Sequence, residues 1–382
     1  MEAHRIRYWL ALKFIEGIGN VGLRNLIETI GSPEEIFRAP ANELVKVRGI
    51  DRDAVERIRK FRDWNRVDKE LEQVARSGAS VVTLEDPIYP ERLLKIHDCP
   101  ALLYVRGVLV QDEACIAVVG SRQASTYGKY STHKLCRELA ANGLTVVSGM
   151  ARGIDSAAHR GAIAGQGRTI AVLGSGMNVI YPPENEDLYN KIPESGAVIT
   201  EFPFGTPPQA RNFPARNRII SGISFGVIVV EATDRSGSLI TARCALEQGR
   251  EVFAVPGNID SPGSRGTHKL IRQGARLVEG IQDILDEIMP QMEKEQQRAI
   301  AEKTAGRRGG MSVIRAGKAL RENETAVIKH ISDVPSEIDD IIAKTGFKPG
   351  DVLNILLNLE LWGHVRQLPG KKFVLNNTLS LK

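Results

Sequence analysis

The sequence predicts an α/β fold: a doubly wound parallel sheet, with a small helical domain before it and a helical domain ending in a β-hairpin after it. Three observations predict this arrangement. Short apolar runs that end in glycine alternate with helix-period segments through the middle of the chain. Two Gly-Ile turns separate amphipathic helical patterns near the start, and three helical patterns precede a hairpin pattern near the end. The 382 residues suffice for two or three domains at roughly 100–200 residues each.

Residues 1–62 are expected to form the first helical domain. The segments IEGIGNVGLRNLIETI and KVRGIDRDAVERIRKF each place a Gly-Ile turn between apolar helical faces, which is the layout of two helix-hairpin-helix units. Such turns often approach a phosphate backbone, but a helical domain that uses glycine only for turning explains the pattern equally well. Gly17, Gly19 and Gly22 also spell GxGxxG. Because no βαβ unit surrounds them, we expect no dinucleotide site there.

Residues 63–113 are expected to connect this domain to the core, with a short helix, one strand at SVVTL and a proline-punctuated stretch. From Ala114 onward the pattern is regular, and buried strands that alternate with helices form a doubly wound sheet. We therefore expect the core at residues 114–289. Its predicted strands are CIAVVG, LTVVSG, RTIAVLG, GAVITEF, GVIVVEA, EVFAVPG and ARLVEG.

Residues 290–322 are polar, basic and interrupted by glycine, as expected of a linker. Residues 323–382 give helical patterns at ENETAVIKHI, PSEIDDIIAKTG and KPGDVLNILLNLELWG, then a hairpin at HVRQLPGKKFVLN that turns on Leu-Pro-Gly-Lys. Three helices and a hairpin predict a winged-helix domain. Its net charge is zero, so whether it contacts DNA stays open.

Composition and charge narrow the class of protein. Hydrophobic residues make up 42% of the chain, yet no run approaches the ~18 apolar residues of a membrane span. Without a leader cleavage site or a CxxC pair, we expect a cytoplasmic protein with no disulfide framework and no metal. The net charge is +5, but residues 63–289 carry −2. A polyanionic partner of the core would therefore be bound by individually placed residues.

Small polar residues follow several predicted strands. In an open parallel sheet, ligands bind outside the carboxyl ends of the strands. Helix starts at these points aim backbone N–H groups at one crevice, which suits an anion or a phosphate. We therefore predict that the following residues bind a phosphate-containing ligand: Gly120, Ser121, Arg122, Ser148, Gly149, Arg152, Gly174, Ser175, Ser236, Gly237, Ser238 and Thr241.

The segment PPQARNFPARNRIISGIS, between the fourth and fifth core strands, gathers arginines around one aromatic ring. Guanidinium groups for phosphates and an aromatic face for a base are what single-stranded nucleic acid requires. In the structural alternative, the ring belongs to the core and the arginines form a solvated face. The candidate contacts are Arg211, Phe213, Arg216, Asn217 and Arg218.

Patterns for catalysis are weak by comparison. HExxH, GxSxG and Walker A motifs are missing. Asp155 and His159 are spaced to share a helix face, but a helix-dipole aspartate and an ordinary histidine explain them. Glu201 and Glu231 end strands and could act as a general base, without an evident nucleophile or metal partner. We expect no catalytic residue and no cofactor.

Taken together, these segments resemble one known family. The strings GSRQASTYG, SGMARGIDSAAHRGA, LGSGMNVIYPPEN, TEFPFG, FPARNRIISGIS, EATDRSGSLITARCALEQGREVFAVPGN and GSRGTHKLIRQGA closely resemble the DNA-processing protein family DprA, also called Smf. The resemblance implies an extended Rossmann-like core that binds single-stranded DNA, usually as a homodimer, without known catalysis. It further implies a recombination mediator that protects incoming DNA, displaces single-strand-binding protein and loads RecA recombinase during natural transformation.

By position, Arg122, Phe213, Arg216 and Arg218 resemble the family's DNA-contacting residues, and the loop at 236–238 resembles part of the same pocket. One departure concerns the loop after Tyr181-Pro182, where some members have a basic residue. Here Pro183-Glu184 follows, so a phosphate contact from this loop is in doubt.

The alternatives use the same crevice. The core resembles, more distantly, the lysine decarboxylase-like nucleotide phosphoribohydrolases, which have a PGGxGTxxE loop. Thr241 stands where those enzymes need their glutamate, and a hydroxyl cannot replace a carboxylate in that reaction. A nucleotide-binding module without catalysis also stays open, because it would use the same loops.

Overall fold

The computed structural model describes residues 2–111, 113–306, 326–332, 336–347, 352, 355–356, 359, 365–368 and 372–375. The chain forms two units, Met1–Ile300 and Ala301–Lys382. Within the described part of the chain, no helix combines the length and apolarity needed to cross a bilayer.

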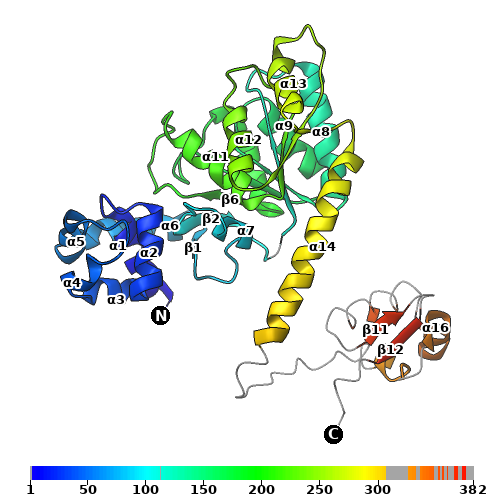
Figure 1. Ribbon diagram of the computed structural model, residues 1–382, viewed down its shortest axis with the longest axis horizontal. Helices are drawn as coiled ribbons and strands as arrows, with labels where there is room; N and C mark the ends of the chain where they lie inside the picture. The colour runs from blue at the N-terminus through cyan, green and yellow to red at the C-terminus, as the bar shows by residue number, and fades with distance from the viewer. Residues whose placement is uncertain are drawn as a thin grey trace. The chain divides into compact units, whose positions relative to one another are not determined.

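The first unit opens with the predicted helical module (Figure 1). Both Gly-Ile turns lie between helices: Gly19 caps the start of α2, and Asp51 caps the start of α5 by accepting a hydrogen bond from the Ala54 N–H. Trp9 and Leu26 are fully buried in the module's core. The GxGxxG pattern therefore belongs to a helix–turn–helix, without the strand that a dinucleotide site needs. The helices are α1 Glu2–Phe14, α2 Asn20–Ile30, α3 Pro33–Arg38, α4 Ala41–Leu44 and α5 Arg52–Arg59, followed by α6 Trp64–Arg76.

A nine-stranded sheet in the order β1-β2-β6-β5-β4-β3-β7-β8-β9 forms the centre of the first unit. The run from β6 to β9 is parallel, and every core strand predicted from the sequence is present. The direction of winding reverses at β3, which places the crevice of a doubly wound sheet beside this strand. The strands are β1 Ala79–Thr83, β2 Leu102–Gly107, β3 Cys115–Val119, β4 Thr145–Ser148, β5 Thr169–Val172, β6 Ala197–Thr200, β7 Gly226–Val229, β8 Glu251–Ala254 and β9 Arg276–Leu277.

The sheet begins earlier than the predicted boundary at residue 114. The β1 strand, predicted from SVVTL, pairs antiparallel with β2, and β2 pairs antiparallel with β6. Residues 63–113 therefore contribute to the sheet as well as connecting domains. We did not predict β2 because it follows a proline-rich loop and lacks the strand–glycine–helix rhythm of the parallel strands. Only its pairing with β6, far along the chain, extends the sheet there.

Helices cover both faces of this sheet. Apolar side chains of α8, α9 and α14 pack on one face, and those of α7, α11, α12 and α13 pack on the other. Figure 1 shows α8 and α9 on one side of the strands and α11 and α12 on the other. The helices of this part of the chain, with α10 included, are α7 Glu91–Leu94, α8 Thr126–Ala141, α9 Ile154–Ala164, α10 Glu186–Lys191, α11 Asn212–Ile223, α12 Ser238–Glu247, α13 Arg265–Arg272 and α14 Ile281–Gly306.

The predicted linker is partly helical. The α14 helix continues through Pro290 to Gly306, so residues 290–306 are not an irregular linker. The segment EKEQQRAIAEK within it consists largely of strong helix formers, which outweigh its polar character. The remainder of the predicted linker lies outside the described residues.

In the second unit, a three-stranded sheet has the order β10-β12-β11. The predicted hairpin is present, with Val365 of β11 opposite Leu375 of β12. Its Leu-Pro-Gly-Lys turn and most of the third helical pattern lie outside the described residues. Val352, Leu356 and Leu359 of that pattern are buried in the unit's apolar core. The bounds are β10 Ser336–Glu337, α16 Ile338–Thr345, β11 Val365–Leu368 and β12 Lys372–Leu375.

Candidate nucleic-acid interface

A crevice of about 800 Å³ opens at the carboxyl ends of β3 and β7, and a smaller pocket adjoins it at the ends of β4 and β5. The structure thus brings together loops from four strands, as the sequence predicted. Arg122 and Phe213 line both hollows. The other predicted residues that line one or the other are Gly120, Ser121, Gly149, Arg152, Gly174, Ser175, Arg216, Asn217, Ser236, Gly237, Ser238 and Thr241.

The loop after β3 is held in place by Glu231, at the end of β7. Its carboxylate accepts hydrogen bonds from the backbone N–H and hydroxyl of Ser125, at 2.9 and 2.5 Å. Ser125 in turn caps α8 by accepting from the Gly128 N–H at 3.0 Å. A Cβ at Gly128 would lie 2.5 Å from the Glu231 carboxyl carbon, so this contact requires glycine. Glu231 therefore anchors α8 to the sheet and has no feature of a general base.

An internal carboxylate fills the predicted anion site after β4. Asp155 accepts hydrogen bonds from the N–H groups of Gly149 and Ala151, at 3.1 and 3.3 Å. Gly153 has φ +79°, and a Cβ there would lie 2.2 Å from the Ser121 carbonyl oxygen. The loop is thus closely packed against the first one. The sequence predicted that this loop binds a phosphate. In the structure, the N–H groups of Gly149 and Ala151 instead donate to the Asp155 carboxylate.

Arg216 forms the floor of the crevice rather than a free contact. Its guanidinium is buried and donates to the carbonyl oxygens of Gly149 and Val172, and Nε donates to Asn217 at 3.0 Å. Burial lowers the pKa of Arg216 to about 10, while nearby Asp155 opposes that shift. The side chain therefore remains charged at neutral pH. It ties the ends of β4 and β5 together, beside the buried Asp155 carboxyl group that lines the same crevice.

Arg122 and Phe213 form the accessible part of the crevice. The Arg122 guanidinium carbon lies 4.8 Å from the centroid of the Phe213 ring, and among the described residues Arg122 has no ion-pair partner. Phe213 is only partly buried, which rules out the structural alternative that places it in the core. Its ring rests on Gly174, where a Cβ would lie 2.9 Å from the ring. An exposed guanidinium and an aromatic ring are therefore presented side by side.

Tyr181 is a residue of this site that sequence reasoning missed. Its ring centroid lies 5.9 Å from that of Phe213, and it lines both hollows. The sequence comparison drew on Tyr181-Pro182 only to locate the departure at Pro183-Glu184. An aromatic residue between a strand-end glycine pair and a proline pair was the available signal.

Arg152 is exposed and paired with Glu184, the residue that departs from the family pattern. Its Nη2 donates to the two Glu184 oxygens at 2.7 and 3.0 Å. The ion pair lowers the pKa of Glu184 and raises that of Arg152. Glu184 therefore occupies the position on Arg152 that a phosphate would need.

Arg218 does not line the crevice with the other predicted contacts, because an ion pair holds it elsewhere. Its Nη2 donates to both Glu201 oxygens at 2.7 and 2.6 Å, and its Nε lies 3.2 Å from Asp98. Glu201 also accepts from Asn20 of the helical module at 3.0 Å. Arg218 and Glu201 are buried, so this is a structural ion pair and Glu201 is not a free general base.

The two other predicted residues that do not line the crevice are Ser148 and Arg211. The Ser148 hydroxyl is buried and donates to the Val118 carbonyl at 2.6 Å. Arg211 is exposed at the start of α11 and faces neither hollow.

The Asp155–His159 pair is not a catalytic dyad. His159 is fully buried, and its Nδ1 lies 2.7 Å from the Thr169 hydroxyl. That hydroxyl donates its only proton to the Val146 carbonyl, so Nδ1 must be the donor and Nε2 the unprotonated nitrogen. Nε2 is buried without a partner. Burial, reinforced by Arg216 and Arg160, lowers the pKa of His159 to about 3.

We expect acid to destabilise the protein through His159. Unfolding restores a pKa of about 6.5, so the unfolded state binds the proton first. The contribution of His159 to the free energy of unfolding is complete above pH 6.5 and falls as the pH drops toward 3. At pH 5 about 2 kcal/mol of it is lost. Urea unfolding between pH 5 and 7 should show a flatter pH dependence for His159→Asn, which keeps a donor near Nδ1. Equal slopes for the two proteins would contradict a buried neutral histidine.

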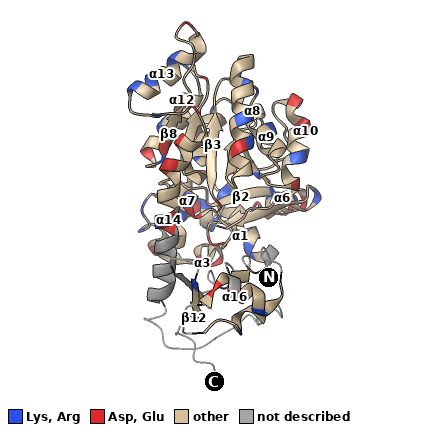
Figure 2. Ribbon diagram, turned by 90° about the vertical axis from the view of Figure 1, so that its right-hand side faces the viewer, with Lys and Arg blue, Asp and Glu red and all other residues tan. Residues whose placement is uncertain are grey.

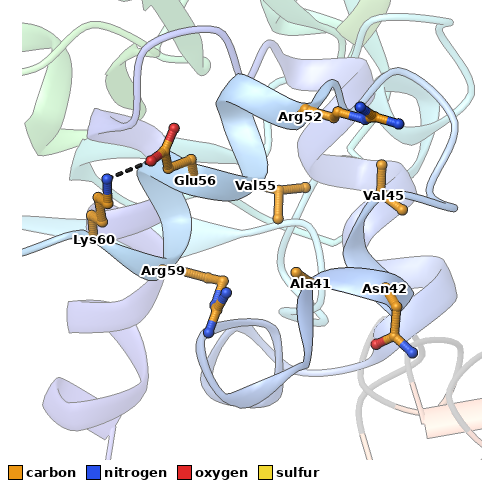
Figure 3. A pocket seen from close by; sticks show the side chains of 8 residues that line it. All are labelled: Ala41, Asn42, Val45, Arg52, Val55, Glu56, Arg59 and Lys60. Atoms are coloured by element: carbon orange, nitrogen blue, oxygen red, sulfur yellow. Dashed lines mark hydrogen bonds and ion pairs between the residues drawn. The ribbon is translucent and has the colours of Figure 1, made fainter.

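The helical module holds a separate basic pocket of about 680 Å³ (Figure 3). Arg52, Glu56, Arg59 and Lys60 lie along one face of α5, and Asn42 of α4 faces them. Lys60 is paired with Glu56, whereas Arg52 and Arg59 have no ion-pair partner among the described residues. The first hairpin, by contrast, docks on the core through Asn20.

Three family models match the chain. The model for DNA recombination-mediator protein A matches residues 80–289, the DprA winged-helix model matches 315–371, and the SAM-like helix-hairpin-helix tandem model matches 10–61. The first match includes β2 and every loop of the crevice. The predicted helix-hairpin-helix and winged-helix domains are thereby confirmed.

Individual relatives agree with these models. Protein Smf of Synechocystis is 34% identical over 388 residues, which cover 96% of this chain and 98% of that protein. The X-ray structure of DNA processing protein A from Streptococcus pneumoniae has 38% identity and a TM-score of 0.65, covering 74% of this chain and 98% of that one. The structure of DNA processing protein A from Helicobacter pylori, a study of its single-stranded DNA binding mode, has 30% identity and a TM-score of 0.50, covering 56% and 97%. The chain therefore belongs to the DNA recombination-mediator protein A family, known as DprA or Smf.

Proposed function

We propose that the crevice binds single-stranded DNA, with Arg122 on a phosphate and the Phe213 ring on a base. The observation that carries this proposal is the Arg122–Phe213 pair, in which an exposed guanidinium lies beside a partly exposed aromatic ring. The contact between them is weak, about 0.5–1 kcal/mol for an exposed pair. Arg122 can therefore move from the ring to a phosphate, which frees the ring face for stacking. Buried Arg216 supports the site by its charge.

The test is a salt titration of DNA binding. Fluorescence anisotropy of labelled oligothymidylate should show tighter binding than to duplex, with log K falling by about 0.7 per phosphate contact against log salt. Salt-independent binding, or preference for duplex, would contradict the proposal. Competition by mononucleotides at similar affinity would instead favour a nucleotide-binding module.

A hydrolase is the weaker candidate on chemical grounds. Thr241 stands at the position of the needed glutamate, and the three carboxylates that the sequence offered as candidates are already engaged. Asp155 is held by backbone N–H groups, Glu231 by Ser125, and Glu201 by Arg218. A general base needs a free carboxylate within reach of a water or substrate proton. We therefore propose a binding protein rather than an enzyme.

Family membership supports a proposal for the role in the cell. We propose that the chain acts as a homodimer, protects incoming single strands, displaces single-strand-binding protein and loads RecA recombinase during natural transformation. Light scattering tests the dimer. Assembly of RecA on strands coated with single-strand-binding protein tests loading, which should require the chain and fail with Arg122→Ala.

Glu184 should oppose DNA binding, because it competes with phosphate for Arg152. Glu184→Gln is expected to tighten binding of oligothymidylate and to steepen the salt dependence by about 0.7, the value for one additional phosphate contact. The matched control is Glu72→Gln, which also removes an exposed carboxylate paired with an arginine, Arg76. If both variants tighten binding equally, the effect is one of net charge and Arg152 is not a contact.

A further inference from the structure

Among the Phe, Tyr and Trp side chains that the structure describes, only two tyrosines on α8 are classed as exposed. Tyr127 is 62% exposed and Tyr130 is 69% exposed, whereas the other Phe, Tyr and Trp side chains described are buried or partly buried. Neither ring belongs to a core cluster or to an aromatic pair within the described part of the chain. Large rings left in water at neighbouring positions indicate a contact surface.

The tyrosines share one helix face with basic residues. At 100° per residue, Tyr127, Tyr130, Lys134 and Arg137 line one stripe, opposite the face that buries Leu135 and its neighbours against the sheet. Lys134 and Arg137 are exposed and have no ion-pair partner among the described residues. Glu138 borders the stripe at its far end. Figure 2 shows basic colouring on α8. Along this exposed face, two aromatic rings are therefore followed by two cations.

This stripe continues directly from the crevice. The α8 helix starts after the loop of Arg122, and Ser125 fastens its first turn to Glu231 at the end of β7. Tyr127 and Tyr130 thus lie in the first turns of α8, five and eight residues after Arg122, although neither lines the crevice itself. The helix of 16 residues extends the path by roughly 24 Å, at 1.5 Å per residue.

We infer that α8 is a second contact for single-stranded DNA, which leaves the crevice over Tyr127 and Tyr130 and passes Lys134 and Arg137. Exposed rings offer stacking platforms for bases, and the cations follow the phosphates. A protein partner would call for a contiguous apolar patch larger than two tyrosines, whereas the rest of this stripe is basic. This inference rests on the proposed DNA binding in the crevice, and it adds the direction in which the strand runs.

Oligonucleotides of two lengths distinguish binding in the crevice from binding along α8. Anisotropy is measured with labelled oligothymidylates of about 4 and about 30 nucleotides, the first short enough for one small binding site. The double variant Tyr127→Ala/Tyr130→Ala should bind the long strand roughly tenfold more weakly and the short strand normally. Tyr127→Phe/Tyr130→Phe keeps both rings and should bind both strands like the unaltered protein. Lys134→Gln/Arg137→Gln should reduce the salt dependence for the long strand only.

The controls distinguish this inference from the proposed function. Leu246→Ala removes a side chain that is 61% exposed on α12, on the opposite face of the sheet, and should change neither affinity. Arg122→Ala should weaken the binding of both the short and the long strand. Unchanged binding of both would contradict the proposed DNA site in the crevice. Photocrosslinking of a 5-bromouracil strand should recover peptides that contain Tyr127 or Tyr130.

Three results would overturn the inference while leaving the crevice in place. The first is that the unaltered protein gains no affinity with strand length. The second is that the double alanine variant binds the long strand normally. The third is that this variant changes only the oligomeric state in light scattering, in which case the tyrosines contact a second copy of the chain.

Discussion

Replacing Arg218 with alanine is expected to lower the stability of the first unit by about 3–5 kcal/mol, the range for breaking a buried ion pair. The side chains of Arg218 and Glu201 are 10% and 6% exposed. Without the guanidinium, the Glu201 carboxylate stays buried with only Asn20 at 3.0 Å and Lys13 at 3.9 Å as polar partners. Thermal melting and urea unfolding measure the loss. At a temperature where the variant remains folded, its binding of oligothymidylate should be nearly unchanged.

The matched control for Arg218 is its neighbour Arg211. Arg211→Ala removes an exposed arginine from the same segment and should alter stability by less than about 0.5 kcal/mol. The double variant Arg218→Met/Glu201→Leu replaces the whole ion pair by apolar groups and should regain part of the stability. A variant Arg218→Ala that melts normally but binds DNA poorly would restore the interpretation of Arg218 as a DNA contact.

The second large effect concerns DNA affinity. Arg122→Ala should weaken binding of single strands by about 1–3 kcal/mol, because it removes a charge-assisted contact to a phosphate. Part of this loss should disappear at high salt, where the release of counterions from a phosphate contributes less free energy to binding. The measurement is anisotropy at two salt concentrations.

Phe213→Ala is the companion to Arg122→Ala at the same site. Losing the ring should also reduce the binding free energy for single strands by about 1–3 kcal/mol. This loss should change little with salt, because stacking releases no counterions. The ring is partly exposed, so the variant should melt near the normal temperature. A large drop in melting temperature would mean that Phe213 acts mainly by packing on Gly174. Equal salt dependence for both variants would contradict the separate roles of charge and stacking.

Local patterns predicted most of the core. The runs CIAVVG and GVIVVEA became β3 and β7 because apolar, β-branched residues in a short run suit a strand buried on both faces. The crevice followed from topology, since parallel strands end at one edge of the sheet. The β2 strand was missed because it joins the sheet through antiparallel pairing with β6, and nothing in LLYVRG indicates that partner.

The arginines of the site show where sequence reasoning stops. Arg216 and Arg218 look alike in FPARNR, yet Arg216 reaches two strand-end carbonyl groups and Arg218 reaches Glu201. Arg122 is the one of these three that stays exposed. A sequence gives the charge of each side chain but not the distant group that neutralises it.

The sequence by itself determined the order of the parallel strands and their helices, the edge of the sheet at which their loops converge, and the kinds of side chain gathered there. These properties depend on periodicity and on residues close together in the chain. Only the tertiary structure decided that Asp155 fills the second loop, that Glu184 pairs with Arg152, and that Arg122 is exposed beside a partly exposed Phe213. The reason is physical: burial and charge pairing depend on groups that folding brings together, and Arg152 and Glu184 are 32 positions apart.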